Sequence, residues 1–400
     1  MRPKQLALVG VLGVIVTATF GEAPSFQGLG DLSGGEHYSI ADKVSANGET
    51  VVGKATSESG YEAFRWTASA GIVGLGDLPG GDFDSRAHDA SADGAVIVGS
   101  SCSALSGSAF EAFRWTATDG IRGLGDLPGG RFYSRAYGIS DDASVVAGIG
   151  SSSASGLNFE AFRWTATTGV VGLGDLPGGD FHSRAYNLSA DGDAVVGWSD
   201  SSAGMEAFLW TPIGGMRPLG DLAGGAFASS GSAVSDNREV VVGWGTSELG
   251  MEAFLWTDAT GIRGLGDLGG GDYCSEAFGV SADGSVVVGR AATASGEEAF
   301  IWNETHGMRT LASVLGDAGL SLGGWTLTTA HCVTPDGETI VGRGINPAGE
   351  VEGWIAIIPE PGTLSLVALG ALAMIPRRRI VEQERPAGHL GSPCLVADAM

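Results

Sequence analysis

A five-residue motif, Gly-Leu-Gly-Asp-Leu, recurs along the chain at a nearly constant interval. Its aspartate lies at positions 31, 77, 126, 175 and 267, and a close and a degenerate copy place positions 221 and 313 in the same register. The interval is 46 or 49 residues each time. A steady period in this range indicates repeated supersecondary units, so the repeat limits every other inference about the fold.

Each repeat contains four short segments that we name a, b, c and d, for example residues 87–91, 95–99, 111–116 and 121–127. Segments b and c are rich in β-branched and aromatic residues, which favour strands. Asp-Gly or Asn-Gly pairs lie between a and b in most repeats and suit two-residue hairpins, because glycine tolerates a positive φ. Asp142-Ala143 and Asn237-Arg238 lack that glycine, so we expect less comfortable turns there. Each repeat is therefore predicted to be a four-stranded antiparallel meander.

The order of the segments predicts how the array ends. Segment d appears first at residues 26–32, before any a, b or c, and the last repeat stops after c at residues 357–358. A closed ring explains this division, because the first strand can complete the last sheet. We therefore predict that residues 24–358 form an all-β fold, a seven-bladed β-propeller of four-stranded antiparallel blades closed by the N-terminal strand. Repeated aromatic residues such as Phe64 and Trp66 are expected to pack between blades. A β-solenoid is the alternative.

The composition excludes some classes of function. The net charge is −24 and the only lysines are Lys4, Lys43 and Lys54, so nucleic acid is not expected as a partner. The four cysteines share no short spacing and no repeat position, which argues against a zinc site or a disulfide framework. A single Cys274–Cys332 bridge stays open as an alternative. No cofactor is predicted.

The N-terminal segment differs from the repeats. Residues 1–23 combine Arg2 and Lys4 with an apolar run and then small residues. This pattern predicts a signal peptide and export of the remaining chain. An uncleaved N-terminal anchor is the alternative, and it too places the repeats outside the cytoplasm.

The C-terminal segment, residues 359–379, has three parts in a fixed order. It begins with Pro359-Glu360-Pro361, continues with an apolar stretch at 363–375 and ends with Arg377-Arg378-Arg379. An apolar run of this length with a basic stop suits a transient or thin membrane anchor, and a mobile apolar tail is the alternative. The segment resembles the PEP-CTERM sorting signal of exported proteins of Gram-negative bacteria. The resemblance implies processing by an exosortase and a location at the cell envelope, the outer surface or the extracellular matrix. Residues 380–400 extend beyond the family's usual end and are predicted to be a disordered tail.

Segment c also carries a resemblance. Its sequence Glu-Ala-Phe-Arg-Trp, at 111–115 for example, recurs together with Ser-Ala-Asp-Gly and Val-Val-Gly segments over most of residues 26–358. This pattern resembles the bacterial extracellular HAF-repeat family, with Glu-Ala-Phe where the family has His-Ala-Phe. The resemblance implies a repeat architecture and an extracellular location, and it brings no assigned chemistry.

One face of the predicted ring carries the variation between repeats. The d–a and b–c connections share this face, which we call the loop face, and the a–b and c–d turns share the opposite, hairpin face, which is expected to be plain. Two b–c connections, 102–110 and 151–159, are three residues longer than the others. The d–a connections of three repeats carry the candidate binding residues Arg86, Arg135, Arg184, Tyr133 and His182.

Arginine and tyrosine are frequent contact residues, so the hypothesis is that this sector binds an anionic glycan or a partner surface protein. The alternative is that the arginines only offset neighbouring aspartates such as Asp84.

No catalytic constellation follows from the spacing. The aspartate-rich turns lack the ordered oxygen ligands of a calcium loop, the six histidines are scattered over the repeat positions, and the glutamate of segment c recurs in every repeat and is expected to be structural. No metal site is predicted. The main hypothesis is a non-enzymatic, exported binding scaffold. The alternatives are an enzyme acting on extracellular polysaccharide at the channel mouth, for which His331 is a candidate residue, and a surface filler without a ligand.

Overall fold

The computed structural model describes residues 23–358, and these form an all-β fold with one short helix. The predicted signal peptide up to residue 22, the sorting residues Pro359, Glu360, Pro361, Arg377, Arg378 and Arg379, and the tail at 380–400 lie outside the described residues.

The strands follow the predicted order, and we name their groups units 1 to 7. The first strand, β1 (Ser25–Gly28), precedes unit 1. Unit 1 comprises β2 (Gly34–Val44), β3 (Val51–Ser57), β4 (Gly60–Thr67) and β5 (Gly71–Gly74). Unit 2 comprises β6 (Gly80–Ala90), β7 (Val96–Ser103), β8 (Phe110–Thr116) and β9 (Gly120–Gly125). Unit 3 comprises β10 (Gly129–Ile139), β11 (Val145–Ser152), β12 (Glu160–Thr165) and β13 (Gly169–Gly172). Unit 4 comprises β14 (Gly178–Leu188), β15 (Val195–Ser201), β16 (Gly204–Thr211) and β17 (Gly215–Gly220).

The remaining units are less regular at their ends. Unit 5 comprises β18 (Gly224–Val234), β19 (Val241–Ser247), β20 (Gly250–Thr257) and β21 (Gly261–Gly264). Unit 6 comprises β22 (Ser275–Val280), β23 (Val286–Thr293), β24 (Gly296–Asn303) and β25 (Gly307–Thr310), and α1 (Leu311–Asp317) follows it. Unit 7 comprises β26 (Thr326–Val333), β27 (Thr339–Ile345) and β28 (Val351–Ile357).

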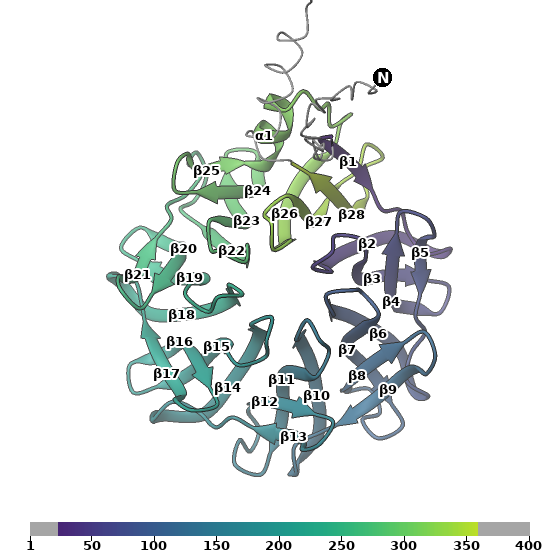
Figure 1. The fold of residues 1–400 in the computed structure, drawn as a ribbon, viewed down its shortest axis with the longest axis vertical. Helices are drawn as coiled ribbons and strands as arrows, with labels where there is room; N and C mark the ends of the chain where they lie inside the picture. Colours follow the sequence, from purple (N-terminus) through teal and green to yellow (C-terminus); the bar gives the residue numbers. More distant parts are fainter. Residues whose placement is uncertain (1–22, 359–400) are drawn as a thin grey trace, which may run out of the picture. The chain divides into compact units, whose positions relative to one another are not determined.

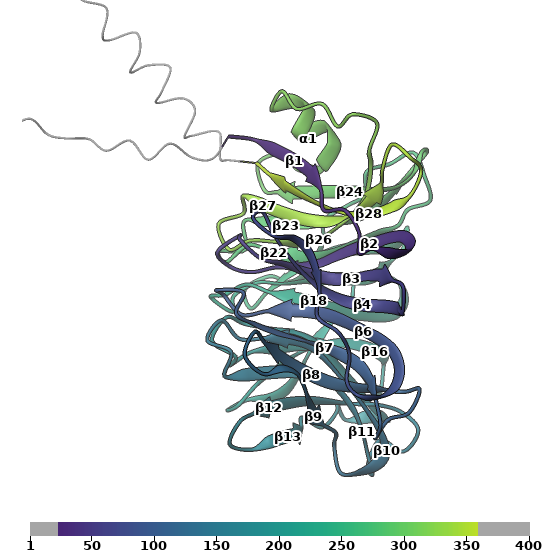
Figure 2. The ribbon, with the colours of Figure 1, turned by 90° about the vertical axis from the view of Figure 1, so that its right-hand side faces the viewer.

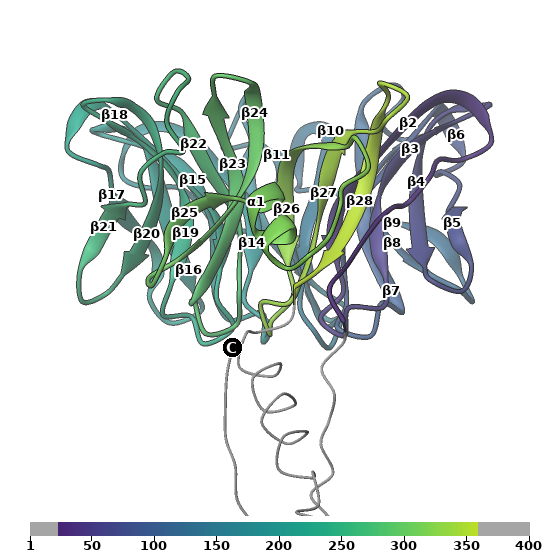
Figure 3. The same ribbon diagram turned by 90° about the horizontal axis from the view of Figure 1, so that it is seen from above.

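Within each unit the strands pair antiparallel with their sequence neighbours, as the meander prediction requires. The units follow one another around a central axis, with unit 7 beside unit 1 (Figure 1). This is the arrangement of a β-propeller and differs from the β-solenoid that was the alternative. Edge-on views show the two faces, the loop face and the hairpin face (Figures 2 and 3).

The two ends of the described chain meet in unit 7. Strand β1 pairs antiparallel with β28, and Ser25 lies opposite Ile357. A parallel bridge between Tyr38 and Val351 joins β28 to the first strand of unit 1. The order of the segments predicted that the earliest strand joins the sheet of the last three strands, and β1 does so by pairing with β28.

The aromatic residues of segment c pack between units, as predicted. The phenylalanine of this segment is fully buried in each of units 1 to 6: Phe64, Phe113, Phe162, Phe208, Phe254 and Phe300. Phe162 illustrates the packing, because it lies in one cluster with Val98 and Ala112 of the preceding unit. The facing strand is glycine at this point, and a Cβ added to Gly148 would lie 2.8 Å from the Phe162 ring. The pairing of glycine with phenylalanine in units 1 to 6 therefore reflects close packing between neighbouring strands of one blade.

Two polar residues of the repeat fix neighbouring units to each other. Ser134 in unit 3 accepts a hydrogen bond from the N–H of Ala112 (3.0 Å) in unit 2 and donates one to the carbonyl oxygen of Gly125 (2.6 Å). The glutamate of segment c binds a backbone N–H of the motif, as Glu160 does for Gly174 (3.2 Å). The glutamate is structural, as predicted.

Two local departures from the repeat have local causes. Ala143 and Arg238, which replace turn glycines, adopt positive φ values of 59° and 63° and are the two non-glycine residues that do so in the described chain. The degenerate motif copy at 310–314 lacks the glycines and forms the start of α1. Thr310 caps this helix by accepting a hydrogen bond from Ser313 N (3.1 Å).

Candidate functional site

The structure brings the five predicted binding residues into one cluster, which we call the arginine sector. Arg86 lies on β6, Tyr133 and Arg135 on β10, and His182 and Arg184 on β14, all half-buried. These are the first strands of units 2, 3 and 4, which line the central axis (Figure 1). The three arginines share one repeat position, and Tyr133 and His182 share another two residues earlier, so the repeat places the five residues side by side.

Each arginine of the sector stacks on an aromatic ring of the preceding unit. The guanidinium carbon of Arg86 lies 5.7 Å from the ring centroid of Tyr61, and that of Arg135 lies 4.1 Å from Phe110. Arg184 lies 4.8 Å from the Phe159 ring centroid. These distances are those of cation–π contacts.

A second aromatic ring, from the same unit, flanks each of these arginines, and for Arg86 this ring is Phe110, at 4.9 Å. Tyr133 lies 5.5 Å from Arg135, and Trp198 lies 5.3 Å from Arg184. The result is a row of alternating guanidinium groups and rings from unit 1 to unit 4. Such a row offers both charge and flat apolar surface to a ligand.

The aromatic residues Tyr61, Phe110 and Phe159 were not identified from the sequence. Each directly precedes the glutamate of segment c, where units 4 and 5 have methionine. The signal that could have identified them was the coincidence of an aromatic residue in one repeat with an arginine in the next. The longer b–c connections of units 2 and 3 end at Phe110 and Phe159, so the insertions lie beside the sector.

The three arginines differ in how their charge is balanced. Arg86 forms a two-point contact with the Asp84 carboxylate, at 3.0 and 2.9 Å. For this residue the structure agrees with the alternative prediction that the arginine offsets the charge of a neighbouring aspartate. Arg184 donates from Nε to His182 Nε2 at 3.3 Å. Arg135 forms no ion pair with any residue from 23 to 358, and its buried Nε has no hydrogen-bond partner there.

Protonation of His182 is disfavoured in this cluster. Burial and then the charge of Arg184 lower the pKa of His182, although Asp200 lies 3.5 Å from its Nδ1. A neutral imidazole leaves the positive charge of the sector on the guanidinium groups, which remain charged at all accessible pH values.

Three further cations extend the sector around the axis. Lys54, Arg290 and Arg343 each follow the last glycine of segment b in units 1, 6 and 7. Arg290 is paired with Glu276 (2.9 Å) and Glu297 (2.7 Å). Together with the three arginines of the sector they form what we call the cation ring, which comprises Lys54, Arg86, Arg135, Arg184, Arg290 and Arg343. In a chain with a net charge of −24 this ring concentrates positive charge at one place.

A carboxyl and an imidazole lie inside the cation ring. Burial raises the pKa of Asp42 to about 6, even though Lys54 and Arg343 favour the carboxylate. His331 Nδ1 lies 3.8 Å from Asp42 Oδ1 and 2.8 Å from the carbonyl oxygen of Ala41. Burial lowers the pKa of His331 to about 4, so the imidazole is neutral near pH 7. Of the two groups, Asp42 therefore has the pKa that lies closer to neutrality.

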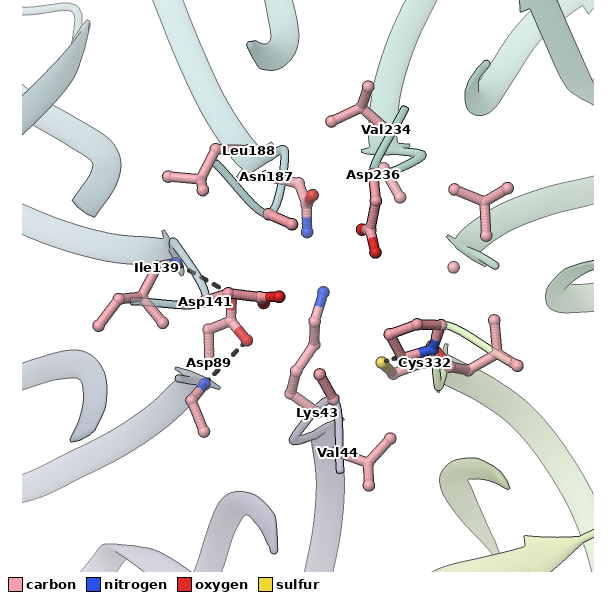
Figure 4. Close-up of a pocket in the computed structure, with 18 residues that line it drawn as sticks. Lys43, Val44, Asp89, Ile139, Asp141, Asn187, Leu188, Val234, Asp236 and Cys332 are labelled. Atoms are coloured by element: carbon pink, nitrogen blue, oxygen red, sulfur yellow. Dashed lines mark hydrogen bonds between the residues drawn. The ribbon is translucent and has the colours of Figure 1, made fainter. Parts of the chain in front are cut away.

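Segment a presents polar residues to the central axis. A cavity of about 80 Å³ at the hairpin-face end of the axis is lined by residues from all of units 1 to 7. The side chain of Lys43 extends into its centre, surrounded by Asp89, Asp141, Asn187 and Asp236 (Figure 4). Segment a does contain small residues, but they face the neighbouring units, and the polar residues face the axis.

Charge balance explains why this lysine stays ionised. Although burial acts to lower it, the pKa of Lys43 is raised by the nearby Asp89, Cys332 and Asp236. The Asp89 carboxylate also accepts hydrogen bonds from Ala90 N (2.8 Å) and Ile139 N (3.0 Å), which ties unit 2 to unit 3. A cavity this small holds only a few water molecules, so this cluster fills the end of the channel.

Other candidate chemistry is limited in the described part of the chain. Residues 23–358 contain no group of three or more histidine, cysteine or acidic side chains placed to hold a metal ion. Cys274 and Cys332 are free thiols, so the alternative of a bridge between them is wrong. The same residues include no helix with the length and apolar character needed to cross a bilayer.

Comparisons with known proteins extend this picture only slightly. No family model matches the sequence, and no curated protein matches it. Among solved structures, the chain is similar to TolB from Acinetobacter baumannii at 13% identity and a TM-score of 0.45, covering 64% of this chain and 62% of TolB. It is similar to an oligogalacturonate lyase from Vibrio parahaemolyticus at 12% identity and a TM-score of 0.49, covering 85% of this chain and 98% of the lyase. A putative TolB from Agrobacterium tumefaciens has 14% identity and a TM-score of 0.36, with coverage of 80% and 91%. At these identities and TM-scores the likenesses do not indicate a function, which has to be inferred from the residues of this chain.

Proposed function

We propose that the chain is an exported, non-enzymatic binding scaffold, built as a seven-bladed propeller that β1 closes. The proposal for closure is supported by the pairing of β1 with β28 and by the bridge between Tyr38 and Val351. The cavity that residues from all of units 1 to 7 line also supports it. A rigid ring of this kind holds side chains from several units at fixed separations, which suits binding without a conformational change.

The arginine sector is the proposed binding site, and its ligand is an anionic glycan. One observation carries this proposal: the guanidinium of Arg135 lies between the rings of Phe110 and Tyr133 without a carboxylate partner among residues 23–358. An unpaired, half-buried guanidinium is costly unless a ligand satisfies it. Aromatic rings beside it provide the flat surface on which sugar rings stack, and the guanidinium provides a two-point contact for a carboxylate or sulfate group.

The place of action follows from the chain ends and is part of the proposal. The resemblance of residues 359–379 to a PEP-CTERM signal supports sorting by an exosortase-type enzyme, contact with the membrane and display at the envelope or in the matrix of a Gram-negative bacterium. The resemblance of the repeats to the HAF-repeat family agrees with that location. An extracellular acidic polysaccharide would meet the cation ring there, and long-range attraction would concentrate it at the channel mouth.

A second candidate function is cleavage of an extracellular polysaccharide. It is favoured by the Asp42–His331 pair within the cation ring, because a carboxyl with a pKa near 6 can act as a general acid or base. The same charged surface would then hold the substrate over this pair.

The experiment measures binding and turnover together. The purified full chain is titrated with uronic-acid oligosaccharides, sulfated oligosaccharides and neutral oligosaccharides by calorimetry, and the mixtures are analysed for shortened products. We expect binding of the acidic ligands that weakens with added salt, because screening reduces the attraction of exposed charges, and no products.

The matched variants test the site directly. Replacing Arg135 and Arg184 with glutamine should reduce affinity at least tenfold, and the further replacement of Arg86 should reduce it less, because Asp84 already neutralises that residue. Arg263→Gln is the control, since Arg263 pairs with Glu304 on the hairpin face. Equal affinity in all variants would overturn the site, and product formation lost in Asp42→Asn would favour the enzyme.

A further inference from the structure

The hairpin face, which the sequence predicted to be plain, carries a second cationic site. A groove of about 680 Å³ lies between units 2 and 3. Arg114 on β8, Arg122 on β9 and Arg163 on β12 line it, and we call it the three-arginine groove. Volumes of roughly 300–1,000 Å³ are typical of small-molecule sites.

The pairing of the strands makes this arrangement unusual. Arg114 lies directly opposite Arg122 in the register of β8 and β9. Like charges at directly opposite positions destabilise a sheet. Neither arginine forms an ion pair with a residue in the described part of the chain. The one acid in the lining, Asp119, accepts a hydrogen bond from Thr116 Oγ1 at 3.1 Å.

The other units show how the repeat normally avoids this situation. The residue opposite the arginine of segment d is Leu209 in unit 4 and Leu255 in unit 5. In these units the arginine of segment d pairs with an acid of the next unit, as Arg217 does with Asp258 at 2.8 Å. The same position in unit 3 is Ala166, which lines the three-arginine groove.

Two sequence differences therefore act together at one interface. The acid that would compensate Arg122 is absent at Ala166, and segment c has arginine at 114 and 163 where units 4 and 5 have leucine. Arg163 is held in place because its Nε donates to the carbonyl oxygen of Gly192 at 3.3 Å. Arg122 is exposed, and Arg114 and Arg163 are half-buried.

From this we infer that the three-arginine groove binds an oxyanion, either a free inorganic anion or the acidic group of a sugar-sized molecule. Arginine forks match carboxylate, sulfate and phosphate oxygens in two-point contacts. Half-buried Trp164 and Leu124 add an apolar wall that a bare ion would leave unused. The site is on the opposite face from the arginine sector and does not depend on it.

The experiment uses the purified full chain and reads binding by calorimetry and by the ligand-induced shift of the melting temperature. The probes are inorganic sulfate, glucuronic acid, a sulfated glucose and neutral glucose. The decisive variant is Ala166→Asp, which restores the acid that unit 5 carries and adds no bulk beyond what that unit accommodates. We expect the acidic probes to bind the native chain and to bind Ala166→Asp at least tenfold more weakly, and neutral glucose not to bind.

A second variant and a control keep the test decisive. Arg114→Leu gives unit 2 the residue of units 4 and 5, and it should cause the same loss. Arg217→Ala, which removes the equivalent but paired arginine between units 4 and 5, should leave binding unchanged. Tighter binding of the sugar acids than of sulfate identifies a sugar-sized ligand, and equal binding identifies a free anion. Absence of binding by every acidic probe, or undiminished binding in both Ala166→Asp and Arg114→Leu, overturns the inference.

Discussion

The backbone N–H of Gly30 donates a 2.8 Å hydrogen bond to Oε1 of Glu352, although 322 positions separate the two residues. The other carboxylate oxygen of Glu352 accepts a hydrogen bond from Asn346 Nδ2 (2.9 Å) and lies 3.2 Å from His37 Nε2. The same glutamate position makes the same contact inside the chain at Glu160 and Gly174. One element of the repeat therefore serves both to order each unit and to join the first strand to the last.

The first prediction concerns this junction. Glu352→Ala removes charge-assisted hydrogen bonds from a buried site and should lower the free energy of unfolding by about 2–3 kcal/mol. It should also abolish the protection of amides 25–28 against hydrogen exchange, because β1 loses its side-chain anchor. Urea unfolding and hydrogen exchange measured by mass spectrometry check both effects. Glu160→Ala is the control: it should be destabilising while leaving residues 25–28 protected, and loss of protection in both variants alike would contradict the assigned role.

The second prediction uses the strained turn of unit 3. Ala143→Gly should raise the free energy of unfolding by roughly 0.5–1 kcal/mol, because glycine adopts the positive φ of 59° without the Cβ clash that alanine has. Chemical denaturation measures the change. Two reverse substitutions calibrate it: Gly71→Ala, where no atom lies within 4 Å of the new Cβ, should lose a similar amount, and Gly94→Ala should lose more, because its Cβ would lie 2.3 Å from Thr50 Oγ1. A more stable Gly71→Ala would refute the argument from φ.

The third prediction tests the packing between units. Phe162→Ala should cost about 3–5 kcal/mol of unfolding free energy, since a fully buried ring leaves a cavity against Val98 of the preceding unit. Thermal and urea unfolding provide the measurement. Val171→Ala in the same unit is the control, and because Val171 is 47% exposed it should change stability by less than about 0.5 kcal/mol. A small effect of Phe162→Ala would mean that the units do not share a core.

The fourth prediction concerns pH. Burial, and then the charges of Arg135, Lys54 and Arg86, lower the pKa of His88 from 6.5 to about 3. The unfolded chain therefore binds more protons than the folded chain between these values, so the contribution of His88 to stability is complete above pH 6.5 and is lost as the pH falls toward 3. Relative to His88→Gln, the native chain should lose stability between pH 7 and pH 4.5. Urea unfolding at a series of pH values measures this, and a difference that stays constant with pH would contradict the shift.

Much of the fold was predictable because the residues that build it recur in every repeat. Three kinds of residue have similar neighbours from unit to unit: glycine at the turns, and phenylalanine and glutamate in segment c. One repeat therefore predicts the surroundings of these residues in the other repeats. The pairing of β1 with β28 was predictable from the order of the segments alone. The site was predictable only in part. Arg86, Arg135 and Arg184 stand out by repeat position, but their stacking partners come from the unit before, and the contact appears only when units are placed side by side.

The hairpin face shows the limit of repeat-based inference more clearly. Turn types predicted a plain face, and that prediction was wrong at two places, the cavity around Lys43 and the three-arginine groove. Lys43 meets Asp141 and Asp236 across the axis, a relationship between units that are not sequence neighbours. The groove arises from the missing acid at Ala166 together with the arginines at 114 and 163. The missing acid becomes noticeable only by comparison with the units in which the arginine of segment d forms an ion pair, such as Arg217 with Asp258.

Because Ser25 pairs with Ile357, the same fold could be produced from a circularly permuted chain. Since the described chain begins and ends at neighbouring points of unit 7, a short linker could join these ends, and new termini could be opened in a turn of the hairpin face elsewhere. A circularly permuted chain of this kind would keep every contact between units, including those of the arginine sector. The position at which synthesis starts is therefore separable from the geometry of the arginine sector.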